Sequence, residues 1–132
     1  MTDKTAGTLS KLLGPLGAEA LTALWRNGRP LSVRQVQEEL NRKRPEPLAY
    51  TTVMTVLSRL AARNVLRRTP AGRGFLYEPL VADAAEVAVR DVIRDHGIAA
   101  VAHFVDQCRT EPQLRSRLLN LMQPDSDETE SG

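Results

Sequence analysis

Apolar residues recur at intervals of three to four positions over most of the chain, a period that predicts α-helices. In the first half this pattern predicts helices over residues 15–27, 33–42 and 49–63. Gly14 and Pro15 stand at the start of the first helix. A proline is tolerated there because the N–H of a first helical residue has no partner within the helix. Ser32 and Gln35 form a capping box, S-x-x-Q, at the start of the second helix.

The hydrophobic period changes from 3.6 to 2 after the third predicted helix. "VLRRT" and "GFLYEP" are predicted strands, and the "PAGRG" between them places glycines at the tip of a hairpin. Asn64 is predicted to be a left-handed C-cap between the helix and the hairpin. A short "RPL" before residue 32 is predicted to pair as an edge strand. Residues 15–79 thus predict the order helix, short strand, helix, helix, hairpin.

The remainder of the chain is predicted to be helical, over about 84–96, as a short helix "IAAVAHFVDQC", and in a third helix that begins with a Thr110–Gln113 capping box. Three short helices enclose only a thin core by themselves. They either pack back on residues 15–79 or pack against the same helices of a second chain. We favour a homodimer, because closed two-fold dimers are the commonest soluble assembly. The expected interface residues are Val87, Val92, Ile93, Val101, Phe104, Val105, Leu114, Leu118, Leu121 and Met122.

The outward face of the predicted helix 49–63 has an unusual composition. If Tyr50, Val53, Val56, Leu57 and Leu60 point inward, the opposite face consists of Thr51, Thr52, Met54, Thr55 and Ser58. Solvated helix faces normally carry Glu and Lys. Short hydroxyl and methyl groups can approach base edges closely, form hydrogen bonds there and pack on thymine methyls. The alternative is an ordinary exposed helix of a protein-interaction module.

Charge is distributed unevenly along the chain. The net charge is +2, yet residues 26–73 hold eleven Arg or Lys against three Glu, and residues 74–132 hold five Arg against eleven Asp or Glu. A basic block predicts contact with a polyanion, although a chance distribution on a solvated surface is the alternative. The expected DNA-backbone contacts are Arg34, Arg42, Lys43, Arg44, Arg67, Arg68 and Arg73.

Together these patterns predict a mainly α fold with a small β wing, in which a winged helix-turn-helix DNA-binding domain precedes a helical dimerisation region. In such a unit the second helix of the motif lies in the major groove of double-stranded DNA. The predicted domains are a disordered tail over 1–10, the winged helix over 11–79, the dimerisation region over 80–123 and a disordered acidic tail over 124–132.

The segments "LGPLGAEALTALWRNGRPLSVRQVQEELN" and "LAYTTVMTVLSRLAARNVLRR" resemble the penicillinase-repressor family, the winged-helix repressors of β-lactamase and methicillin-resistance operons and their actinobacterial relatives. The resemblance covers about residues 12–122. It implies a homodimeric transcriptional repressor that binds palindromic operators and uses the helices after the wing as its dimerisation region. By position it assigns base contacts to Thr51, Thr52, Met54, Thr55 and Ser58.

The resemblance also bears on regulation. In antibiotic-responsive members a regulatory protease cuts the dimerisation region, and the matching bond here is His103–Phe104 within "AVAHFVDQ". Those members have Asn before the Phe where this chain has His, and the alternative is that Phe104 is a core residue of its helix. Copper-responsive members carry C-terminal cysteine pairs, which this chain lacks.

Other functional classes find little support in the sequence. His103 and Cys108 lie about 140° apart around a helix and do not converge on one ion, so we expect no metal site, cofactor or enzyme activity. One cysteine, no signal segment and no membrane-spanning run predict a cytoplasmic protein. Two alternatives stay open: a small-molecule-responsive winged helix with an effector pocket between the DNA-binding and dimer regions, and a protein-interaction winged helix.

Overall fold

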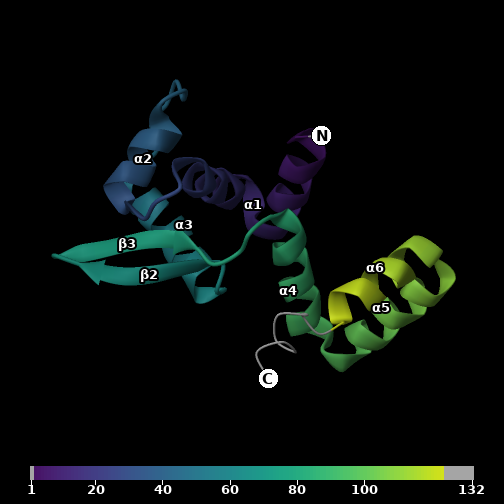
Figure 1. Ribbon diagram of the computed structural model, residues 1–132. Helices are drawn as coiled ribbons and strands as arrows, with labels where there is room; N and C mark the ends of the chain where they lie inside the picture. The colour runs from purple at the N-terminus through teal and green to yellow at the C-terminus, as the bar shows by residue number, and fades with distance from the viewer. Residues whose placement is uncertain (1, 124–132) are drawn as a thin grey trace. The chain divides into compact units, whose positions relative to one another are not determined.

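The computed structural model describes residues 2–123, with side chains from residue 7 onward (Figure 1). The chain divides after Val89 into two compact units. The predicted acidic tail, residues 124–132, lies outside the described residues.

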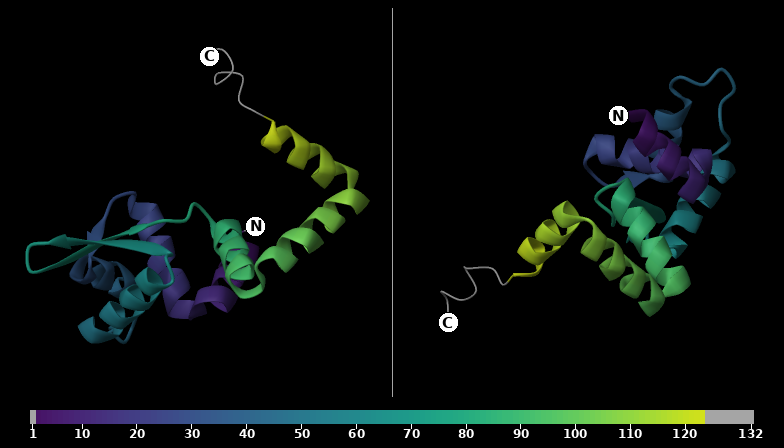
Figure 2. Two further views of the ribbon diagram at one scale, coloured as in Figure 1. Left: turned by 90° about the horizontal axis from the view of Figure 1, so that it is seen from below. Right: turned by 90° about the vertical axis from the view of Figure 1, so that its right-hand side faces the viewer.

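The first unit combines helices with a small antiparallel sheet (Figures 1 and 2). The sheet has three strands in the order β1-β3-β2, so β3 is central. In chain order the elements are α1 Thr2–Asn27, β1 Leu31–Ser32, α2 Val33–Asn41, α3 Tyr50–Ala62, β2 Leu66–Ala71, β3 Gly74–Pro79 and the beginning of α4 Ala84–His96. This order matches the winged-helix arrangement predicted from the sequence.

The α1 helix begins well before the predicted start. Residues 2–10 are helical, so the predicted disordered tail is wrong for the described part of that segment. The physical reason is Leu9, which is 1% exposed and belongs to the hydrophobic core. The sequence nevertheless located a real break: Gly14 has φ 81° and ψ 158°, and Pro15 opens the second helical segment as expected.

Local capping signals explain where the next helices begin and end. The Ser32 Oγ accepts a hydrogen bond from the Gln35 backbone N–H at 3.1 Å, and the Gln35 Oε1 accepts one from the Ser32 N–H at 2.9 Å. Asn64 follows α3 with a φ of 63°, the left-handed conformation predicted for it. The capping box therefore fixes where α2 begins, and Asn64 fixes where the chain leaves α3 for the hairpin.

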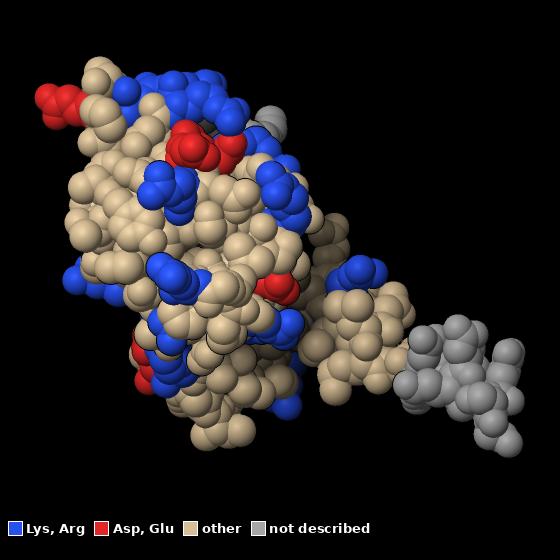
Figure 3. Space-filling model, turned by 90° about the vertical axis from the view of Figure 1, so that its left-hand side faces the viewer, with Lys and Arg blue, Asp and Glu red and all other residues tan. Residues whose placement is uncertain are grey.

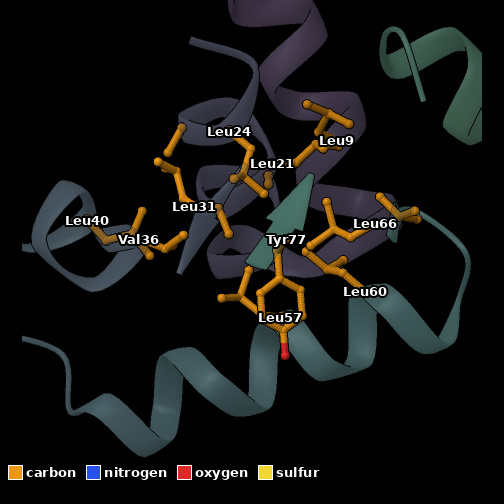
Figure 4. Close-up of a cluster of buried hydrophobic side chains, with 14 of the residues drawn as sticks. Leu9, Leu21, Leu24, Leu31, Val36, Leu40, Leu57, Leu60, Leu66 and Tyr77 are labelled. Atoms are coloured by element: carbon orange, nitrogen blue, oxygen red, sulfur yellow. The ribbon is translucent and has the colours of Figure 1, made fainter. Parts of the chain in front are cut away.

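The core of the first unit lies between the helices and the inner face of the sheet (Figure 4). Tyr77 of β3 is 1% exposed and its ring lies beside Leu57 of α3. Val53 and Leu60 complete the buried stripe of α3, as predicted. Tyr50 is an error in that prediction: it is 44% exposed, because as the first residue of α3 it lies beyond the end of the core.

The α4 helix begins inside the first unit. Val81, Ala84 and Val87 are buried in its core, and the Trp25 Nε1–H donates a 2.9 Å hydrogen bond to the Val81 carbonyl. The predicted domain boundary between residues 79 and 80 therefore precedes the observed division by about ten residues. Val87, predicted at a dimer interface, is instead a core residue of the first unit.

The second unit contains the end of α4 and the packed pair α5 Ile98–Thr110 and α6 Pro112–Met122. The predicted Thr110–Gln113 capping box is wrong. Thr110 is the last residue of α5 and its hydroxyl donates to the Gln107 carbonyl, while Pro112 opens α6. A proline at the first helical position needs no partner for an N–H, which explains the start without a capping side chain.

Glu39 on α2 links the first two helices. Its carboxylate contacts Arg42 at 2.6 Å and Arg26 of α1 at 3.5 Å. A hydrogen bond from the Asn27 side chain, together with the charges of these arginines, lowers the pKa of Glu39. A carboxyl whose pKa is lower in the folded than in the unfolded state stabilises the fold above the unfolded pKa, about 4.3, and loses that contribution as the pH falls through the folded value.

We therefore expect Glu39→Gln to lower the free energy of unfolding most above about pH 5, and progressively less as the pH falls towards 3. Urea unfolding at a series of pH values measures this difference. Glu38→Gln removes the same charge from an exposed position of the same helix and is the matched control. If Glu39→Gln lowers the free energy of unfolding by the same amount at every pH in this range, Glu39 does not have the lowered pKa described above.

Candidate nucleic-acid interface

The α3 helix is fixed on one side and open on the other. Val53, Leu57 and Leu60 are at most 3% exposed and hold the helix against the core. On the opposite side Thr51, Thr52 and Thr55 are exposed, Met54 is 39% exposed and Ser58 is half-buried. All five predicted base-contacting residues thus share one accessible face. We name these five residues the threonine face.

The start of α3 also leaves backbone donors accessible. Ala49 occupies the N-cap position and gives no side-chain hydrogen bond. The first N–H groups of a helix have no partner within the helix, and they carry the positive end of its dipole. An anion such as a phosphate can occupy this end of the helix.

The turn between α2 and α3 is held by two polar side chains of α2. The Leu48 N–H donates to the Asn41 Oδ1 at 2.7 Å, and the Leu48 carbonyl accepts from Asn41 Nδ2 at 3.2 Å and from Gln37 Nε2 at 3.0 Å. These bonds fix where α3 begins relative to α2. Sequence reasoning missed both residues, since "KRPEP" showed only that the helix ends.

A groove of about 600 Å³ runs along one edge of the threonine face. Thr51, Thr52, Thr55 and Arg59 of α3 line one wall, and residues 13–17 of α1 line the other. The Arg63 Nη1 donates to the Leu12 carbonyl at 2.8 Å and ties the two walls together. Arg59 is an exposed basic residue at this face that the predicted set of backbone contacts omitted.

Some of the predicted basic residues are exposed to solvent, whereas Arg44 is paired with an acidic residue of α1. Arg34 and Lys43 are exposed, and Arg42 keeps a 69% exposed side chain beside Glu39. On the side of the molecule towards which the hairpin tip points, Lys and Arg predominate over acidic residues (Figure 3). Arg44 differs, because its guanidinium pairs with Glu19 of α1 at 2.6 Å and is 30% exposed. Arg44 therefore packs between helices, and its contact with the DNA backbone stays a prediction.

The hairpin of β2 and β3 closes with a two-residue turn, Gly72–Arg73, since Ala71 pairs with Gly74. Gly72 has φ 61°, the positive value that a type II′ turn requires at this position. Arg73 is exposed at the tip. Beyond its pairing with β1 at Leu31 and Ser32 the hairpin continues outward from the helices (Figures 1 and 2).

Neighbouring arginines on β2 belong to opposite faces of the hairpin, because side chains alternate along a strand. Arg68 pairs in register with Tyr77, whose ring lies beside α3, so Arg68 shares the α3 side of the sheet. Its guanidinium lies 4.3 Å from the centre of the Phe75 ring. Arg67 lies on the other face and contacts Glu78 at 3.7 Å.

Other kinds of site find no support within residues 2–123. No group of three His, Cys, Asp or Glu side chains is placed to hold a metal ion in this part of the chain. None of the helices there is long and apolar enough to cross a membrane. Cys108, the chain's one cysteine, is buried in the second unit and forms no disulfide.

A helix-turn-helix joined to a small sheet whose hairpin extends from it defines a winged helix. Comparison with known proteins identifies its family: the model described as "Penicillinase repressor" matches residues 13–124, and the chain belongs to this family of transcriptional repressors. The sequence-based assignment is confirmed.

The relatives that match this chain by sequence agree with this assignment. The chain is 38% identical over 105 residues to the transcriptional regulator BlaI of Mycobacterium tuberculosis, in strains CDC 1551 / Oshkosh and ATCC 25618 / H37Rv, and the match covers 72% of each chain. A crystal structure of a probable transcriptional regulator from Pseudomonas aeruginosa has a TM-score of 0.43 and 22% identity, over 92% of this chain and 90% of that one.

Proposed function

We propose that this protein is a sequence-specific DNA-binding repressor that binds palindromic operators as a homodimer, with α3 in the major groove. One observation carries the proposal: α3 is anchored by a buried apolar stripe and presents the threonine face to the exterior, beside a basic surface. Such a face has the short hydroxyl and methyl groups that base edges accept. Long acidic side chains there would be repelled by phosphate.

The accessible basic residues around the threonine face are the proposed contacts to the DNA backbone. Arg34, Arg42 and Lys43 of α2 and the turn that follows it, together with Arg68 and Arg73 of the hairpin, are the proposed phosphate contacts. Phosphate contacts set register and affinity, whereas base contacts select sequence. Arg73 at the narrow hairpin tip is suited to enter a minor groove.

The second unit supports the homodimer. Val92, Ile93, Val101, Phe104 and Leu114 are between 41% and 54% exposed in the single chain, and Leu121 and Met122 are 66% and 72% exposed. Val105 at 36% and the half-buried Leu118 lie among them. Soluble monomers rarely leave so many large apolar side chains in water. A second copy of the same helices buries them in an isologous interface.

Release by a regulatory protease at His103–Phe104 stays a prediction of the family resemblance. Both residues are exposed in the single chain, where Phe104 is 54% exposed and is not part of the chain's own hydrophobic core. The bond lies in the middle of α5. Because proteases act on segments that open locally, cleavage there requires α5 to unfold.

Two kinds of variant test the division between base and backbone contacts. We expect Thr52→Ala or Thr55→Ala to reduce discrimination between an operator selected with the purified protein and a scrambled duplex by about 1–3 kcal/mol for each lost base contact. Lys43→Ala should weaken binding to both duplexes alike and flatten its salt dependence. Fluorescence anisotropy with both duplexes at several salt concentrations measures these effects. If both kinds of variant change the two affinities in the same way, the assignment of the threonine face fails.

A further inference from the structure

Two aromatic side chains stand exposed on either side of a groove in the first unit. Tyr50 at the start of α3 is 44% exposed and Phe75 of β3 is 38% exposed. The groove between them has a volume of about 400 Å³. Its other walls are the first turn of α2, from Ser32 to Arg34, and the hairpin residues Ala71, Gly74 and Leu76. Neither aromatic ring contributes to the core, so folding alone does not explain their positions.

The groove lies on one side of the threonine face. With about 100° per residue, Tyr50 and Met54 lie on the edge of α3 towards the hairpin, whereas Thr52 and Arg59 lie on the edge towards α1. A helix in a major groove about 12 Å wide has a phosphate backbone on each side. The hairpin-side groove therefore lies where one of these two backbones passes when α3 occupies the major groove.

The chemistry of the groove suits a sugar–phosphate chain. No Asp or Glu lines it, and Arg34 stands in its wall. Arg68 adds a second cation through its contact with the Phe75 ring at 4.3 Å. At the start of α2 the Ser32 Oγ caps the Gln35 N–H, while the two N–H groups before it have no carbonyl partner within that helix. Aromatic ring faces can pack against the apolar side of deoxyribose, and arginine guanidinium groups donate hydrogen bonds to phosphate oxygens.

We propose that this groove holds one deoxyribose–phosphate segment of the operator backbone, with Tyr50 and Phe75 against the sugar and Arg34 and Arg68 against the phosphate. The inference rests on the proposed function and adds Tyr50 and Phe75 to the DNA-contacting residues. It also separates the two hairpin arginines, because Arg67 faces away from α3 and pairs with Glu78. Of these two arginines, Arg68 is therefore the proposed contact to the DNA phosphate, and Arg67 is not.

The test uses the full-length protein and two duplexes of equal length, one selected from a random library with the purified protein and one scrambled. We expect Arg68→Ala and Phe75→Ala each to weaken binding to both duplexes by about tenfold at moderate salt. Arg68→Ala should also reduce the salt slope by about 0.9. Arg67→Ala, the matched control one residue away on the opposite face, should bind within about twofold of wild type. Thermal unfolding verifies that these variants fold.

A second measurement locates the contact. Neutral methylphosphonates replace single phosphates of the selected duplex, one position at a time. The substitution at one position should weaken binding by the wild type but not by Arg68→Ala, because that variant has already lost its contact with the phosphate at this position.

Different results overturn different claims. If wild type binds the duplexes and Arg67→Ala is as damaging as Arg68→Ala, or if Phe75→Ala weakens the selected duplex alone, the groove does not hold the backbone. If wild type binds neither duplex, the proposed function fails and this inference fails with it.

Discussion

The full-length protein carrying Phe104→Asp is expected to be monomeric and to bind a palindromic operator at least about 100-fold more weakly than wild type. Phe104 is 54% exposed on α5, and the proposed dimer places its ring in an apolar interface. A carboxylate there would be buried without a partner, which opposes association. Two linked DNA-binding units gain roughly 10²–10⁴-fold in affinity over one, and the monomer loses this gain.

Sedimentation velocity and operator binding, measured on the same samples, test this expectation. Ala99→Asp is the matched control, because it adds the same charge to an exposed position of α5 about 140° away from Phe104. The control should remain dimeric. A Phe104→Asp protein that still sediments as a dimer disproves the proposed interface, and a monomer that keeps full operator affinity disproves the need for two units.

Leu57→Ala is expected to lower the free energy of unfolding by about 2–5 kcal/mol. Leu57 is fully buried at the centre of the α3 stripe, beside Tyr77 of the sheet (Figure 4). Its truncation removes apolar contacts and leaves a cavity that the neighbouring side chains fill only partly. Since small domains have a total stability of about 5–15 kcal/mol, this is a large share of it.

Urea unfolding followed by circular dichroism measures the loss. Thr55→Ala, on the exposed side of the same helix, is the control and should change stability by no more than about 0.5 kcal/mol. If Leu57→Ala costs less than 1 kcal/mol, α3 is not held by this stripe. The threonine face would then lack the rigid support on which base contacts depend.

Much of the fold followed from local patterns. Capping at Ser32, the break at Gly14 and the change of period after residue 63 depend on residues close together in sequence, so they could be predicted. The errors arise from distant contacts. Leu9 orders the N-terminal helix by entering a core built from later residues. Val87 joins the same core, although its helix looked like part of the dimerisation region.

The candidate site was predictable in part for the same reason. Helical periodicity placed the threonine face correctly, because it needs only the position of the core stripe. The partner of Arg44 is Glu19, 25 residues earlier, and no local pattern indicates such a pair. Strand alternation could have separated Arg67 from Arg68, but only once the register with Tyr77 was known. The exposure of Tyr50 likewise depends on where the core ends.

The most direct test of sequence-specific recognition by α3 is selection from a random duplex library with the purified full-length protein, followed by affinity measurement at physiological salt. We predict an enriched motif with two-fold symmetry and half-site centres about 34 Å apart, or close to that. The selected duplex should bind at least about 1,000-fold more tightly than its scrambled counterpart. Equal affinity for the two duplexes, or a selection that enriches no motif, contradicts the proposal that the threonine face recognises an operator.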